Sequence, residues 1–156
     1  MRSDKSVACL FATFFYTGYL PYAPGTWCSL VAVILWFIIP WNSLLFRLSL
    51  IFAVLLIGTF VSGIVEKRSG ERDPSFIVID EVAGMWLTLA LLPTITFPEN
   101  IGRIVFAFLA FRFFDILKVP PIKKLESIHG GLGIMLDDIM AGIYAGTLVN
   151  IFTLVF

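Results

Sequence analysis

Five long apolar runs, separated by short polar stretches, dominate the pattern of hydrophobic and polar positions along the chain. They cover residues 27–40, 44–65, 76–97, 101–117 and 134–156. Such runs predict membrane-embedded helices, because a helix needs about 20 mostly apolar residues to cross a bilayer. The first and fourth runs are short for a full crossing, so we expect them to be partly re-entrant or packed among the others.

Two shorter segments complete the expected architecture. The N-terminal stretch "MRSDKSVACLFATFF" has a basic start and an apolar middle but no clean cleavage site, which favours a retained membrane-associated helix. Residues 122–128, "IKKLESI", are apolar at every third position and predict a short amphipathic helix on the membrane surface. The expected fold is therefore all-α: one domain over residues 1–156, forming a polytopic membrane bundle of about five embedded helices plus these two.

Basic residues predict which loops face the cytoplasm. They precede the first run and recur in the loops at 66–75 and 118–133: Arg2, Lys5, Lys67, Arg68, Arg72, Lys118, Lys123 and Lys124. Cytoplasmic loops of membrane proteins carry an excess of lysine and arginine. We therefore predict that the N-terminus and both long loops are cytoplasmic.

The composition indicates a membrane protein and gives no reason to expect nucleic acid as a partner. The chain is 59% hydrophobic and 14% charged, against roughly a quarter charged in an average soluble protein. Its formal net charge is zero, so nothing indicates nucleic acid as a partner. Cys9 and Cys28 form neither a metal-ligand spacing nor a disulfide framework.

Carboxylates inside the apolar runs are the main candidates for chemistry. With the predicted topology they all lie near the cytoplasmic ends of their helices: Asp80, Glu81, Asp115, Asp137 and Asp138. An ionised carboxylate is costly in lipid, and several close together repel one another. A divalent cation removes both penalties, and carboxylate oxygens with water and phosphate are typical Mg²⁺ ligands. The alternative is that each acidic pair only complements a helix dipole.

Glycines support convergence of the two acidic pairs. Gly84 and Gly142 share helix faces with them, and glycine lets helix backbones approach closely. Ordinary small-residue packing explains these two positions equally well.

Two loops could add substrate contacts. In "SIHGGLG", His129 is followed by Gly130 and Gly131 just before a helix, where backbone N–H groups can bind phosphate. Glycine also simply makes turns, and a lone loop histidine is often without a catalytic role. In "PGTWCSL", Thr26 and Ser29 bring hydroxyl groups to the cytoplasmic end of the first run, and Thr26 could also cap that helix.

Four motifs together resemble the phosphatidylglycerophosphatase A family: "PGTWCSL", "IDEVAGMWLTLALLP", "FRFFDILKVPPI" and "HGGLGIMLDDIMAGIYAG". The resemblance runs from about residue 16 to about residue 146. It implies a Mg²⁺-dependent lipid phosphatase of the bacterial inner membrane, which converts phosphatidylglycerophosphate to phosphatidylglycerol and inorganic phosphate. The positions that match the family pattern are Asp80, Glu81, Asp115, Lys118, His129, Gly130, Gly131, Asp137 and Asp138. Cys28 and Val119 depart from it, since glycine and proline are usual there.

Hydrolysis by water with metal assistance is the mechanism we prefer from these residues. The metal ligands would be Asp80, Glu81, Asp137 and Asp138. A cysteine phosphatase needs arginine six residues after the cysteine, which neither cysteine has. A covalent intermediate on an aspartate or on Thr26 stays open.

Basic side chains would bind the phosphate oxygens. The candidates are Lys118, Lys123 and Arg112, although Arg112 could instead pair with Asp115, three residues later.

A function of another class is an ion or proton pathway in a small transporter. Such a pathway should place charges at several depths, whereas these acids share one. A purely structural membrane subunit would give no reason for so many buried acids.

Overall fold

The computed structural model describes residues 6–39, 43–93, 98–125 and 127–155, and all regular structure within these ranges is helical. The elements are α1 (Val7–Ala12), the 3₁₀-helix η1 (Thr17–Tyr19), α2 (Pro24–Ile38), α3 (Leu44–Ser69), α4 (Ile79–Ala90), α5 (Ile101–Leu117), α6 (Ile122–Leu125) and α7 (Gly131–Val155). The predicted all-α class is confirmed.

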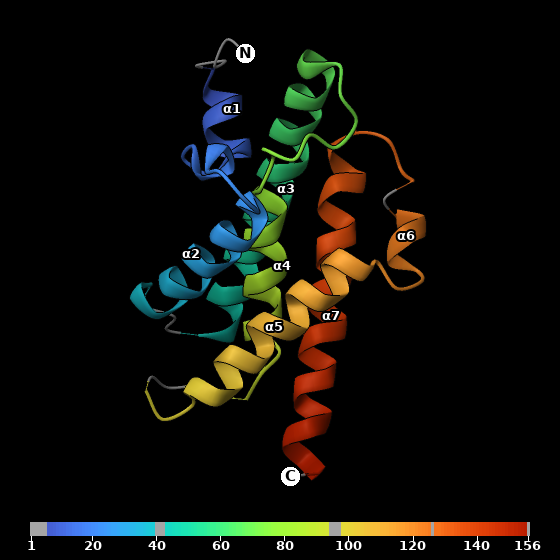
Figure 1. Cartoon of the computed structure of the whole chain (residues 1–156). Coiled ribbons are helices and arrows are strands. Elements are labelled where there is room, and N and C mark those ends of the chain that lie inside the picture. The colour runs from blue at the N-terminus through green and yellow to red at the C-terminus, as the bar shows by residue number, and fades with distance from the viewer. Residues whose placement is uncertain (1–5, 40–42, 94–97, 126, 156) are drawn as a thin grey trace.

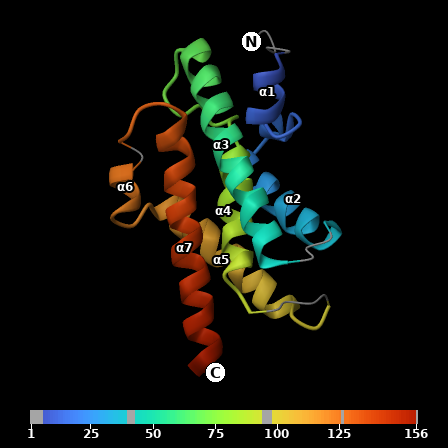
Figure 2. The same ribbon diagram turned by 180° about the vertical axis from the view of Figure 1, so that it is seen from behind.

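The short helix α4 lies at the centre of the molecule (Figures 1 and 2). It packs against α2, α3, α5 and α7, and most of its side chains are buried. The two longest helices, α3 and α7, both pack against it and against each other, and they run in opposite directions, so that the end of α3 and the start of α7 lie at the same end of the molecule (Figure 1). This arrangement brings the first turn of α4 against the N-terminal half of α7.

Two side chains of α4 donate hydrogen bonds to backbone carbonyls of neighbouring helices. The indole of Trp86 donates a hydrogen bond to the carbonyl of Ala32 in α2 at 2.9 Å. The hydroxyl of Thr88 donates to the carbonyl of Gly142 in α7 at 3.3 Å. Buried hydrogen bonds between helices fix their relative rotation, because an unmade bond leaves a buried polar group without a partner.

Glycine allows α4 and α7 to approach closely. A Cβ atom added at Gly142 would lie 2.5 Å from the carbonyl oxygen of Gly84, and one at Gly84 would lie 2.6 Å from the carbonyl oxygen of Asp138. Neither position has room for a side chain. The prediction that these two glycines bring the acid-bearing helices together is confirmed.

Within the described residues, two helices are long and apolar enough to cross a membrane. These are α3, with 26 residues, and α7, with 25. The other three helices of the expected five are too short for this test, because α2, α4 and α5 have only 15, 12 and 17 residues, so the count of five embedded helices stays a prediction. Short apolar helices can still pack inside a bundle without spanning lipid by themselves.

The largest boundary error concerns α4. The predicted run 76–97 is apolar on both sides of its acidic pair, but residues 76–78 are not helical, and the N–H of Val78 donates to the carbonyl of Ala12 at 2.9 Å. The helix ends at Ala90, and residues 94–97 lie outside the described part of the chain. Apolarity predicts burial here but not helical backbone.

Other boundaries agree more closely. Helix α5 has the predicted bounds, and α2 begins three residues early because Pro24 occupies its first turn, where proline is favoured. The expected interfacial helix is shorter, as α6 covers only Ile122–Leu125. The predicted turn at 40–42 and the basic residues Arg2 and Lys5 lie outside the described residues.

Large apolar side chains cover the outer faces of several helices. Phe52 and Phe60 of α3, and Phe113 and Ile116 of α5, are each more than half exposed. Contiguous apolar surface of this kind suits a lipid or protein environment better than water.

Candidate active site

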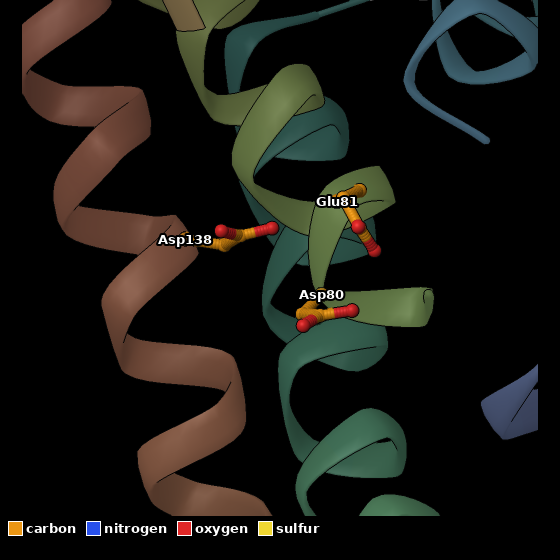
Figure 3. A group of neighbouring side chains, drawn as sticks. All are labelled: Asp80, Glu81 and Asp138. Atoms are coloured by element: carbon orange, nitrogen blue, oxygen red, sulfur yellow. The ribbon is translucent and has the colours of Figure 1, made fainter. Parts of the chain in front are cut away.

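Three carboxylates from two helices converge at the centre of the molecule. Asp80 and Glu81 occupy the first turn of α4, and Asp138 reaches across from α7 (Figure 3). Each offers an oxygen atom, and these three atoms lie within 4.8 Å of one another. Asp80 and Asp138 are only 8% and 2% exposed, so solvent does little to screen the repulsion between their carboxylates.

The three carboxylates retain oxygens without protein partners. Asp80 Oδ1, Glu81 Oε2 and Asp138 Oδ2 are buried and accept no hydrogen bond from the described residues. Buried polar atoms are normally satisfied, and leaving them unpaired costs free energy. Three hard oxygen donors this close together fit a divalent cation such as Mg²⁺. We refer to Asp80, Glu81 and Asp138 as the carboxylate triad.

A guanidinium group borders the triad on the α5 side. Arg112 Nη1 lies 2.8 Å from Asp115 Oδ2 and 3.8 Å from Glu81 Oε1. The same nitrogen lies 3.4 Å from the hydroxyl of Ser29 in α2. The alternative pairing of Arg112 with Asp115 is therefore confirmed, and Asp115 orients this arginine beside the triad.

The start of α2 packs directly against the triad. A Cβ atom at Gly25 would lie 1.9 Å from Glu81 Oε1, so only glycine allows this contact. Thr26 follows in the first turn of α2 and is half-buried. It does not cap the helix, because Ala23 is the N-cap residue and no side chain makes a capping hydrogen bond. The sequence already indicated a turn at Gly25 and hydroxyl groups at Thr26 and Ser29, but it did not show that Gly25 contacts Glu81 or that Ser29 contacts Arg112.

Asp137 is separated from the triad by its own ion pair. Lys118 Nζ lies 3.0 Å from Asp137 Oδ2, and the other Asp137 oxygen accepts a hydrogen bond from the N–H of Asp138 at 3.0 Å. Lys118 also lies 4.0 Å from Asp73 Oδ2. Of the four metal ligands predicted, three form the triad, and Asp137 instead holds a lysine next to it.

The glycine-rich segment departs from the expected loop. Helix α7 begins at Gly131, three residues earlier than predicted. A Cβ atom at Gly131 would lie 1.9 Å from the carbonyl oxygen of Thr59 in α3, so this glycine serves helix packing. Gly130 has a φ of +86°, the left-handed conformation that glycine adopts readily. Because of the earlier start, Asp137 and Asp138 lie nearly two turns into α7 instead of one.

His129 and Lys123 are exposed at the surface and are not part of the triad. His129 is exposed on the connection between α6 and α7, and within the described residues it forms no hydrogen bond or ion pair with the acids. Lys123 is also exposed and lines a cavity of about 420 Å³ with Arg72, Asp73 and Ser127. Arg72 and Asp73 gave no signal in the sequence, since charged residues in a polar loop look ordinary.

Comparison with known proteins assigns the chain to a family. The family model for phosphatidylglycerophosphatase A matches residues 10–153. The chain belongs to the phosphatidylglycerophosphatase A family. This confirms the resemblance seen in the motifs and makes the protein an enzyme of the phosphatase class.

Relatives of this family cover most of the chain. The phosphatidylglycerophosphatase A of Haemophilus influenzae is 41% identical over 140 residues, which are 87% of this chain and 82% of that protein. That of Escherichia coli is 37% identical over 138 residues, or 86% and 76% of the two chains. A Bacteroides thetaiotaomicron protein with the provisional name phosphatidylinositol-3-phosphatase is 34% identical over an alignment of 159 positions, which covers 97% of this chain and 96% of that protein. No solved structure matches the chain significantly.

Proposed function

We propose that this protein is a Mg²⁺-dependent phosphatase of the bacterial inner membrane that releases the terminal phosphate of phosphatidylglycerophosphate. The observation that carries the proposal is the carboxylate triad: three acidic side chains with unpartnered buried oxygens, in a chain of the phosphatidylglycerophosphatase A family. The triad is difficult to explain as a structural feature, since three like charges within 4.8 Å destabilise the fold unless something neutralises them.

The triad residues Asp80, Glu81 and Asp138 would hold the metal ion. When bound there, Mg²⁺ supplies positive charge that polarises the phosphate and activates water for attack. Asp137 completes the site indirectly by fixing the position of Lys118, whose ammonium group lies 3.0 Å from it.

Two basic groups are placed to bind the reacting phosphate. Arg112, held by Asp115 at 2.8 Å, can donate its remaining N–H groups to phosphate oxygens, as guanidinium groups do in bidentate pairs. Lys118 would contribute a second charge from the α7 side. Donors held in place before the reaction stabilise the negative charge that develops on the phosphate in the transition state.

Hydrolysis also needs a proton for the leaving group. Attack of water on phosphorus breaks the bond to the headgroup oxygen, which leaves as an alkoxide and must be protonated. His129, on the connection just before α7, is our candidate for this proton transfer or for orienting the attacking water. Gly130, whose left-handed backbone turns the chain into α7, and Gly131, the first residue of α7, would present backbone N–H groups to the phosphate.

The proposed placement in the membrane follows from α3 and α7. Both would span the bilayer, with the basic loops 66–75 and 118–133 in the cytoplasm. The headgroup would reach the triad from the cytoplasmic interface while the acyl chains stay in lipid.

Phosphatidylinositol 3-phosphate is a second candidate substrate, because the relative that covers 97% of this chain carries the corresponding provisional name. Both candidates are phosphate monoesters on a glycerophospholipid headgroup. Parallel assays with the two lipids in equal micelles would rank them by kcat/KM.

The proposed function is tested by phosphate release from purified protein on phosphatidylglycerophosphate, after chelation and after Mg²⁺ is restored. We expect release that stops on chelation and returns with Mg²⁺. The same preparation in liposomes should carry no ion or proton flux. Ion flux without phosphate release would favour the transporter alternative and contradict the proposal.

A further inference from the structure

A polar cavity lies outside the groups used so far, and one of its wall residues, Asp73, lies 4.0 Å from Lys118. It has a volume of about 420 Å³ and is formed where the loop before α4 meets the connection from α6 to α7, with Arg72, Asp73, Lys123 and Ser127 in its wall. A second, much smaller pocket of about 10 Å³ shares Arg72 and Asp73 with it and reaches Asp137, the residue before Asp138 of the triad. Its lining comprises Glu66, Arg72, Asp73, Ile128, Gly133, Ile134 and Asp137.

Ion pairs connect this cavity with the triad. Asp73 of the cavity lies 4.0 Å from Lys118, which lies 3.0 Å from Asp137, and the adjacent residue Asp138 belongs to the triad. These two ion pairs join the wall of the cavity to the residue next to Asp138.

The lining of the cavity suits a phosphorylated polyol. Arg72 and Lys123 carry donors for phosphate oxygens, and arginine in particular matches the planar arrangement of two such oxygens. Asp73 and Ser127 can exchange hydrogen bonds with hydroxyl groups. A site for bare inorganic phosphate would have little use for the carboxylate, whereas a sugar alcohol next to a phosphate uses both kinds of group.

We propose that this cavity binds the inner phosphodiester and the adjoining polyol of the lipid headgroup, while the outer phosphate monoester occupies the triad. The inference rests on the proposed function. Phosphatidylglycerophosphate and phosphatidylinositol 3-phosphate both carry an inner diester, a polyol and an outer monoester. Phosphatidic acid has only one phosphate, which is a monoester. The cavity thus selects headgroups with two phosphates, and Arg72 is a specificity-determining residue.

Substrate selectivity tests this proposal. We would measure kcat/KM for phosphatidylglycerophosphate and for phosphatidic acid with the same acyl chains, using Arg72→Gln and Lys123→Gln. Both variants should lose about tenfold or more on phosphatidylglycerophosphate, since each loses a charged hydrogen bond, and change little on phosphatidic acid. Lys124→Gln is the matched control, because Lys124 is the exposed neighbour of Lys123 in α6 and does not line the cavity. Its selectivity should equal that of the wild type.

An equal loss on both lipids, or an effect of Lys124→Gln as large as that of Lys123→Gln, would overturn the cavity assignment and leave the proposed function intact. Binding of glycerophosphoglycerol, the deacylated headgroup that has the diester but no monoester, provides a readout without catalysis. The wild type should bind it more tightly than Arg72→Gln does. Equal binding would reject the cavity even if the enzyme proved inactive on phosphatidylglycerophosphate.

Discussion

At the scale of single residues, each carboxylate of the triad should contribute to the affinity for a divalent cation. Asp80→Asn removes one of three negative charges while keeping the size of the side chain, so it should weaken binding of Mg²⁺ or Mn²⁺ by at least about tenfold, equivalent to ~1.4 kcal/mol. Titration calorimetry with Mn²⁺ on the purified variant measures this directly. Unchanged affinity would mean that Asp80 is not a ligand.

The same change should stabilise the protein when metal is absent. Removing one of three crowded carboxylates relieves charge repulsion in a buried site. The melting temperature of Asp80→Asn in chelator should therefore exceed that of the wild type, and in excess Mg²⁺ the order should reverse. A lower melting temperature in both conditions would indicate a purely structural role for Asp80.

Substitutions in the ion pair of Asp137 and Lys118 should have non-additive effects on phosphatase activity. Its separation of 3.0 Å predicts strong coupling. Asp137→Asn and Lys118→Met should each lower phosphatase activity, and the double variant should be no worse than the more damaging single one. Metal affinity should fall less in Asp137→Asn than in Asp138→Asn. Additive losses would show that the two residues act separately.

Sequence reasoning could find these acids but could not divide their roles. Adjacent residues on a helix point about 100° apart, and the sequence does not show whether one or both members of a pair reach the site: Asp80 and Glu81 both do, whereas Asp137 pairs with Lys118 and only Asp138 joins the triad. Which member of the α7 pair joins it depends on the rotation of α7, and that rotation is set by contacts such as Gly142 with Gly84. Arg72 and Asp73 could not be found at all, because only the fold places their loop beside α6.

At the scale of helices, the close approach of α4 and α7 positions the triad. Gly84→Ala and Gly142→Ala would each place a methyl group within 2.6 Å of a backbone oxygen of the other helix. Overpacking of this kind costs roughly 1–3 kcal/mol, so both variants should melt earlier and lose activity. Gly102→Ala in α5 is the control, since a Cβ there meets nothing within 4 Å. It should stabilise the protein by about 0.5–1 kcal/mol through helix propensity. Equal melting temperatures for the three variants would refute the packing argument.

How well the helix bounds could be predicted from the sequence differed between α5 and α4. The bounds of α5 followed from its apolar run because polar residues flank it on both sides. The run containing α4 is apolar on both sides of the helix ends, and its true start depends on a backbone hydrogen bond from Val78 to Ala12. Local composition carries no information about a partner 66 residues away along the chain.

At the scale of the whole molecule, the orientation in the membrane can be tested by cysteine labelling. Single cysteines at Ser69 and Ser127, both exposed, should resist an impermeant thiol reagent in intact cells. A cysteine at Glu99, in the opposite loop, should react. The native Cys9 and Cys28 are buried and can be replaced by alanine beforehand. Labelling of Ser69→Cys and Ser127→Cys from outside would invert the proposed topology.

The central claim is that the carboxylate triad is the reaction centre of a lipid phosphatase, and Asp138→Asn tests it most directly. Asp138 is 2% exposed and joins α7 to the two acids of α4. The measurement is the initial rate of phosphate release from phosphatidylglycerophosphate at saturating Mg²⁺, for wild type and variant at equal folded concentration. We predict a fall of at least about a hundredfold, roughly 2.7 kcal/mol in activation free energy. A variant that keeps more than about a tenth of the wild-type rate, a loss below ~1.4 kcal/mol, would contradict the claim.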